Sequence, residues 1–152
     1  MANKYTKIYI QVVIVVKYRA CLIDKSWKDD LFKYITGIVK NQNHLVISIN
    51  GVEDHVHLLI GMRPHQSLSD LMRHVKGFSS KWINEQNLTQ HPFNWQLGFG
   101  AFSYAPDALP NVIRYIENHD VHHSKKKFLD EYKELLKQYD VEYDEKYLFY
   151  DV

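Results

Sequence analysis

The 152-residue sequence has a single cysteine, Cys21, with only 6 glycines and 4 prolines. One cysteine cannot form an internal disulfide or a cysteine-built zinc cage, and it indicates a reducing compartment. With 45% hydrophobic and 24% charged residues, the chain is neither collagen-like, of low complexity nor wholly disordered. The longest apolar run, residues 12–16, is far too short to span a bilayer, and no signal peptide opens the chain. These absences predict one cytoplasmic globular domain with no membrane partner.

The net charge is also small, because 19 Lys and Arg and 18 Asp and Glu sum to +1. Near-neutrality argues against a nucleic-acid partner, since domains that bind nucleic acid are usually basic. The average hides a split, however. Residues 129–152 hold 8 acids and 3 bases, a net charge of −5, which leaves 16 bases and 10 acids, a net charge of +6, in residues 1–128. The basic body suits a DNA ligand, and we expect the acidic segment to lie away from the bound strand.

Hydrophobic periodicity predicts the element order β-α-β-β-α-β-α-α. Strands are expected at residues 7–18, 45–52, 55–62 and 95–104, and residues 86–94 are expected to form a loop. Helices are expected at residues 26–42, with Ser26 as a possible cap, from after Ser67 to about residue 84, from residue 106 or 107 to 119, and at 125–139. This order matches the split βαβ, ferredoxin-like arrangement. We therefore predict an α+β fold with an antiparallel sheet, packed helices and C-terminal helical additions.

The sharpest motif is His55-Val56-His57, inside the third predicted strand. Residues two apart on a strand point to the same face, so both imidazoles can converge on one metal ion, whereas Val56 faces the other way. Two ligands are too few for a usable site, and at least one more is needed. The plain alternative is a pair of surface histidines.

The third predicted helix offers both a third ligand and a nucleophile. Tyr115 and His119 are four residues apart, so they share one helix face, one turn from each other. A phenol held beside a metal ligand would be close to whatever the metal polarises. The alternatives are that Tyr115 is a core tyrosine and that His122 or His123 replaces His119 as the ligand.

These motifs resemble a known family. HVHLL, then WQLGFGAFS, then YIENH followed by HHSKKKF resemble, in order and spacing, the HUH-type single-tyrosine (Y1) transposases of the IS200/IS605-like family, including the REP-associated tyrosine transposases. The resemblance covers nearly the whole chain. It implies a catalytic domain over residues 1–128, with residues 129–152 as the helix end and acidic tail of the same domain, in a prokaryotic cytoplasm.

The resemblance also implies an activity. Members of this family recognise single-stranded DNA hairpins at element ends and cut one strand through a tyrosine, leaving a 5′-phosphotyrosine and a free 3′-OH that later rejoins. The resemblance implies that Tyr115 corresponds to the nucleophile of the family and that His55 and His57 correspond to its metal ligands. His119 stands where the family usually has a glutamine, which shifts the expected divalent ion from Mg²⁺ towards Mn²⁺ or a softer metal. The family forms homodimers in which the tyrosine helix of one subunit typically completes the site of the other.

Basic residues supply the expected DNA contacts. They are Arg63, Arg73, Lys76, Lys81, Lys125, Lys126 and Lys127. The alternative for the three adjacent lysines, residues 125–127, is that they only form a solvent-exposed face. Two other functions remain open: a three-histidine metallohydrolase that uses water, with Tyr115 only a hydrogen-bond donor, and a domesticated single-stranded DNA-binding module without cleavage.

Overall fold

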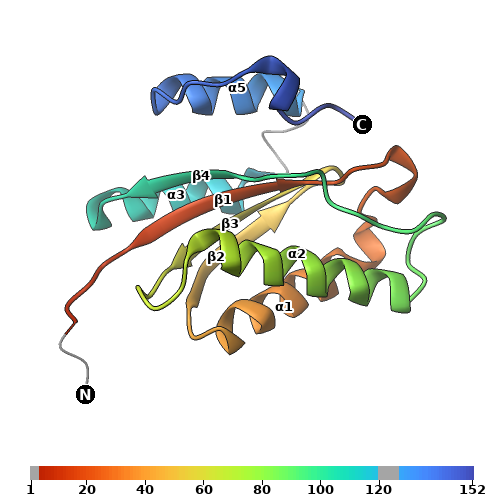
Figure 1. The fold of residues 1–152 in the computed structure, drawn as a ribbon, viewed down its shortest axis with the longest axis horizontal. Helices are drawn as coiled ribbons and strands as arrows, with labels where there is room; N and C mark the ends of the chain where they lie inside the picture. The colour runs from red at the N-terminus through yellow and green to blue at the C-terminus, as the bar shows by residue number, and fades with distance from the viewer. Residues whose placement is uncertain (1–3, 120–126) are drawn as a thin grey trace.

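The computed structural model describes residues 4–119 and 127–152. Four strands form one sheet in the order β2-β3-β1-β4, and every neighbouring pair is antiparallel (Figure 1). The strands are β1 (Tyr9–Val15), β2 (Leu45–Gly51), β3 (His55–Gly61) and β4 (Gly100–Tyr104). The helices are α1 (Lys25–Asn41), α2 (Leu68–Glu85), α3 (Leu109–Glu117) and α5 (Phe128–Gln138). The predicted α+β class and ferredoxin-like strand order are confirmed.

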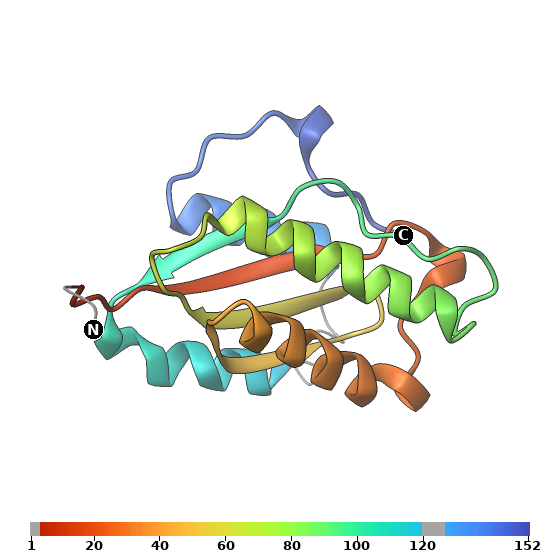
Figure 2. The ribbon, with the colours of Figure 1, turned by 60° about the horizontal axis from the view of Figure 1, so that its bottom comes forward.

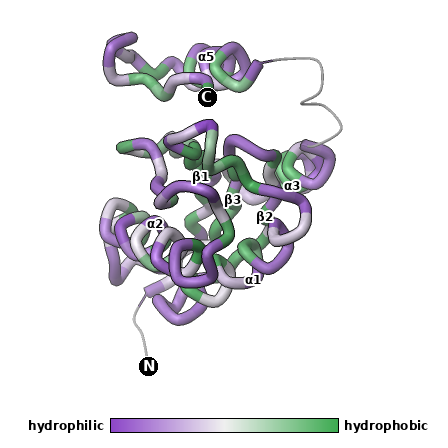
Figure 3. Tube along the Cα trace, turned by 90° about the vertical axis from the view of Figure 1, so that its right-hand side faces the viewer, coloured by the Kyte–Doolittle hydropathy of each residue, from purple (hydrophilic) through white to green (hydrophobic). Residues whose placement is uncertain are grey.

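Helices cover both faces of the sheet (Figures 1 and 3). On one face, side chains of β1 and β3 such as Val12, Ile14 and Leu58 pack against α1 and α2, which Figure 2 shows lying across the sheet. On the other face, Val13 and Val15 of β1 pack against α5. Burial on both faces explains why residues 12–16 form a continuous apolar run rather than an alternating one.

The helix α3 lies over β2 and β3 on the same side of the sheet as α5. Its apolar residues Val112 and Ile116 are buried against Leu59 of β3. A short 3₁₀ turn, Pro106–Ala108, precedes it, so the predicted helical segment divides into this turn and α3. The apolar side chains of α5, Phe128, Tyr132 and Leu136, recur every fourth residue, which makes one stripe that docks on the sheet.

Three of the local predictions need correction, and the predicted cap of α2 is confirmed. Asp24, not Ser26, caps α1, because the Asp24 carboxylate accepts from the Ser26 backbone N–H. The Ser67 cap of α2 is as predicted, with its hydroxyl accepting from the Asp70 N–H at 3.1 Å. The last strand begins at Gly100 rather than at residue 95, since Gly98 adopts a φ of +82°, outside the extended region. The last helix is also shorter than predicted, because α5 begins at Phe128 and ends at Gln138.

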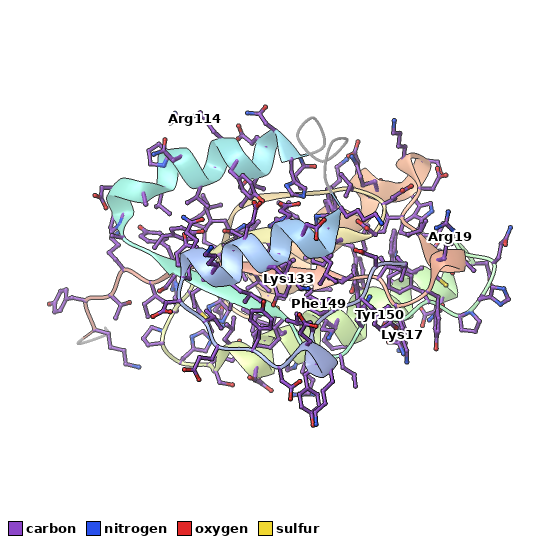
Figure 4. The ribbon with its side chains drawn as sticks, turned by 90° about the horizontal axis from the view of Figure 1, so that it is seen from above. Lys17, Arg19, Arg114, Lys133, Phe149 and Tyr150 are labelled. Atoms are coloured by element: carbon purple, nitrogen blue, oxygen red, sulfur yellow. The ribbon has the colours of Figure 1, made fainter. Side chains whose placement is uncertain are left out.

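The C-terminal segment is attached to the body beside the first strand. Gln96 binds the backbone of Tyr150 twice, at 2.8 and 3.0 Å, and the Tyr150 hydroxyl donates to the carbonyl of Lys17. Figure 4 shows Phe149 and Tyr150 next to Lys17. These contacts hold the chain that follows α5 across the sheet. None of the helices in the described ranges has the length and apolarity needed to cross a membrane.

Candidate active site

His55 and His57 lie on β3, on the face of the sheet that α3 and α5 cover. Both side chains are fully buried, and they pair across the sheet with Val15 and Val13 of β1. Their rings meet edge to face with centroids 5.3 Å apart. The strand alternation therefore places the two imidazoles together, as predicted. They are not the surface pair that stood as the alternative.

His119 joins the pair from just beyond the end of α3. Asn50 of β2, directly opposite His57 in the sheet, donates its side-chain amide to the carbonyls of Ile116 and Glu117 at 2.9 and 3.1 Å. These bonds fix the end of α3 against the sheet. As a result, the His119 Nε2 lies 2.6 Å from the His55 Nε2. The ring centroids of His119 and His57 are 4.1 Å apart.

Glu131 of α5 is the site residue that the sequence did not reveal. Its carboxylate Oε1 lies 3.5 Å from the His119 Nδ1 and 3.7 Å from the His57 Nε2, and its side chain is only 14% exposed. Glu131 belongs to the acidic segment that we expect to lie away from the bound strand, yet it lies beside the histidines. The only local signal was its position three residues after Phe128, at the edge of the apolar stripe of α5.

Four side chains together could hold a metal ion. One ligand atom from each of His55, His57, His119 and Glu131 lies within 4.8 Å of all the others. Three imidazole nitrogens and one carboxylate oxygen in a buried pocket fit a divalent ion such as Mn²⁺, Co²⁺ or Zn²⁺. The residues present therefore suit the metal dependence that the sequence predicts.

A second layer of polar groups orients two of these histidines. The Asp54 carboxylate lies 2.6 Å from the His55 Nδ1, which leaves the Nε2 facing the cluster. Gln11, buried on β1, lies 2.8 Å from the His57 Nδ1, and its carbonyl oxygen accepts from the Tyr104 hydroxyl at 2.7 Å. Such outer partners fix the orientation of ligand imidazoles in metal sites.

Tyr115 borders the cluster on α3. Its ring centroid lies 5.6 Å from that of His57 and 5.5 Å from that of His119. Its hydroxyl donates a hydrogen bond to the Glu131 carboxylate. Burial, and then this hydrogen bond, raise the pKa of the Tyr115 phenol well above its ordinary value. At neutral pH the phenol is therefore protonated.

The predicted DNA contacts on α2 do not lie around this cluster. Arg73 and Lys81 are exposed on α2, on the opposite side of the sheet, and pair with Asp70 at 2.7 Å and Glu85 at 3.8 Å. Lys76 donates to the carbonyls of Gln96 and Gly98 at 2.7 and 2.9 Å, and burial lowers its pKa.

Other predicted residues lie elsewhere. Arg63 is exposed beyond the end of β3, and Lys127 is exposed at the start of α5. Lys125 and Lys126, together with the alternative ligands His122 and His123, fall outside the described residues.

Comparisons with known proteins agree on the family. The model of the family described as "Transposase IS200 like" matches residues 4–119. The ISDra2 transposase TnpA of Deinococcus radiodurans is 25% identical over 111 residues, which cover 69% of this chain and 79% of that protein.

Two solved structures share the fold. A proposed transposase from Deinococcus radiodurans superposes with a TM-score of 0.63 at 20% identity, over 78% of this chain and 95% of its own. A REP-associated tyrosine transposase bound to a REP hairpin superposes with a TM-score of 0.61 at 13% identity, over 81% of this chain and 73% of its own. Since the family model spans all four strands and the whole of α3, the chain belongs to the IS200-like transposase family.

Proposed function

We propose that this chain cuts and rejoins single-stranded DNA through a covalent bond between Tyr115 and a 5′ phosphate. One observation carries the proposal: the Tyr115 phenol borders a buried cluster of three histidines and one glutamate in a chain of this family. A nucleophile beside a metal-binding cluster is the arrangement that phosphoryl transfer needs.

The reaction is a transesterification in which bonds and protons balance. The Tyr115 oxygen attacks the phosphorus, the bond from phosphorus to the 3′ oxygen breaks, and the products are a 5′-phosphotyrosine and a 3′-OH. Held by His55, His57, His119 and Glu131, a divalent ion would supply positive charge to the non-bridging phosphate oxygens. Attack by the 3′-OH on the phosphotyrosine reverses the step and rejoins the strand without an external energy source.

Glu131 receives the proton of the phenol. Because its carboxylate already accepts the Tyr115 hydrogen bond, the proton moves along an existing contact as the oxygen attacks. Proton removal during attack is needed because the raised pKa keeps the phenol protonated beforehand. The proton held by Glu131 then passes through solvent to the departing 3′ oxygen, which regenerates the carboxylate and leaves the net proton count unchanged.

The proposed substrate is a single-stranded DNA hairpin. A relative of the same fold is bound to a REP hairpin, and residues 1–128 of this chain carry a net charge of +6. The basic residues named above, other than Lys76, are proposed to contact the hairpin backbone. Lys76 binds carbonyls of its own chain instead. The homodimer is proposed on the family resemblance. Within one chain Tyr115 already reaches its own histidines, which supports a site that needs no tyrosine from a partner.

A water-using metallohydrolase is the second candidate. The hydrogen bond from Tyr115 to Glu131 favours it, because a water nucleophile would leave the phenol as the hydrogen-bond donor that it already is. The two functions differ in their product. The hydrolase releases both DNA ends, whereas the transposase retains one end on the protein.

The test is adduct formation on single-stranded oligonucleotides that carry palindromes from the DNA flanking the gene, with Mn²⁺ or Mg²⁺ present. We expect an SDS-resistant protein–DNA band with the native chain and with Tyr147→Phe, which alters a tyrosine that is 79% exposed. Tyr115→Phe should lose the band. Cleavage without any adduct would support the hydrolase, and hairpin binding without cleavage in any divalent metal would support a binding module.

A further inference from the structure

A pocket of about 340 Å³ opens beside the nucleophile, between α3, α5 and β4. Figure 4 shows α3 and α5 running alongside each other above the sheet. Three carboxamides and three phenols line the pocket: Gln11, Asn111, Gln138, Tyr104, Tyr115 and Tyr139. Its other lining residues are aliphatic, and none of the lining residues, all within the described ranges, carries a formal charge.

The pocket shares two residues with the candidate active site. Tyr115 lines the pocket, and its hydroxyl donates to the Glu131 carboxylate of the cluster. Gln11 lies between the His57 Nδ1 and the Tyr104 hydroxyl, so the same amide contacts the histidine cluster and lines the pocket. A ligand in this pocket would therefore be next to the phosphate that Tyr115 attacks.

The chemistry of the lining selects the kind of ligand. A phosphate would be held by cations, and the pocket has none among its lining residues. Carboxamides pair with the hydrogen-bonding edges of bases, and aromatic rings offer faces on which bases stack. The Tyr104 and Tyr139 rings, 5.6 Å apart and nearly perpendicular, supply such an aromatic wall. The volume lies near the lower end of the range of about 300–1,000 Å³ for small-molecule sites, which suits one ring system.

We infer that this pocket binds the base of a nucleotide that adjoins the scissile phosphate, with Asn111 and Gln138 contacting the base edge. Both residues lie at exposed positions, Asn111 in the first turn of α3 and Gln138 at the end of α5. The inference rests on the proposed function, because Tyr115 relates the pocket to the scissile phosphate. By binding this base, the pocket selects which base occupies the position next to the scissile phosphate.

Free deoxynucleosides test the pocket without requiring catalysis. We expect at least one of deoxyadenosine, deoxycytidine, deoxyguanosine and thymidine to shift the side-chain amide NMR signals of Asn111 and Gln138 in a saturable manner. Deoxyribose 5-phosphate, which lacks a base, should leave them in place. Gln138→Leu should weaken nucleoside binding several-fold, and Gln90→Leu, at an exposed loop position, should not. The absence of any nucleoside shift, or equal shifts with the sugar phosphate, would overturn the inference.

A second measurement separates this inference from the proposed function. In the adduct assay, each base at the positions flanking the cleavage site is compared with an abasic position. We expect Asn111→Leu and Gln138→Leu each to reduce the ratio of adduct rates between the preferred base and the abasic site by about tenfold. An unchanged ratio would refute base reading by the pocket while adduct formation stands. Nucleoside binding by a chain that never forms an adduct would instead refute the proposed function and leave the pocket as a base-binding site.

Discussion

The hydroxyl of Tyr115 donates a hydrogen bond to the carboxylate of Glu131, which lies 16 residues further along the chain. This bond joins the two helices that cover the histidine cluster. The position of the candidate nucleophile therefore depends on α5, and the docking of α5 depends in turn on the apolar stripe of Phe128, Tyr132 and Leu136. The acidic C-terminal segment thus contributes a residue to the candidate active site.

Glu131→Gln should lower the pKa of Tyr115. Burial raises this pKa most and remains in the variant, whereas the charge of the carboxylate, which raises it further, is removed. We therefore expect ionisation at lower pH than in the native chain but still above the ordinary value of 10.0. NMR titration of ¹³Cζ-labelled tyrosine measures this shift. Asp130→Asn, at an exposed neighbouring position, is the control and should leave the Tyr115 titration in place.

Asp54→Asn should weaken metal binding without removing a ligand. The native carboxylate orients the His55 imidazole through its Nδ1, and loss of such an outer partner costs about 10- to 100-fold in metal affinity. Calorimetric titration with Mn²⁺ or Co²⁺ measures the change. Glu53→Gln alters an exposed carboxylate at the adjacent position and should bind the metal as the native chain does. Equal affinities in both variants would show that Asp54 does not support the site.

Lys76→Met should destabilise the fold, although the sequence suggests only a DNA contact. The ammonium donates to the Gln96 and Gly98 carbonyls, and losing both bonds should cost about 1–3 kcal/mol of unfolding free energy. Lys81→Met, at a side chain that is 72% exposed, should change it by less than about 0.5 kcal/mol. Urea denaturation of the two variants measures the difference. A large loss for Lys81→Met with none for Lys76→Met would contradict these contacts.

Gly100→Ala should loosen the docking of α5. An added Cβ would lie 2.6 Å from the Tyr132 ring and 2.7 Å from its hydroxyl, so Tyr132 would have to move. We expect a loss of about 1–3 kcal/mol and faster hydrogen exchange in α5, which overpacking of this kind produces. Gly77→Ala is the matched control, because nothing lies within 4 Å of its added Cβ and alanine favours the helix α2. That variant should be as stable as the native chain or more so.

Local periodicity in the sequence was sufficient to predict several residues of the candidate site. The alternation of β3 places His55 beside His57, so this pair could be predicted from a short window. Tyr115 and His119 also come together as their spacing suggests, although α3 ends at Glu117 and His119 lies two residues beyond it. The element order likewise predicted the sheet topology. These features depend on neighbours within a few residues.

The remaining features depend on tertiary packing. The local pattern does not reveal which face of the sheet α5 covers, so the sequence does not predict that Glu131 lies beside the histidines. The partners of Lys76 are backbone carbonyls about 20 residues away, at a turn that depends on the positive φ of Gly98. A lysine in the sequence does not reveal whether it will contact DNA or its own chain. The boundaries of the last strand depend on the same glycine.

The identity of the residue that becomes joined to DNA tests the central proposal most directly. The covalent product formed on a single-stranded hairpin oligonucleotide is digested with trypsin, and the DNA-linked peptide is sequenced by mass spectrometry. We predict a nucleotide remnant attached through its 5′ phosphate to Tyr115, the first residue of the peptide that follows Arg114. Attachment to another residue, or complete cleavage of the oligonucleotide with no DNA-linked peptide, would contradict the assignment of Tyr115 as the nucleophile.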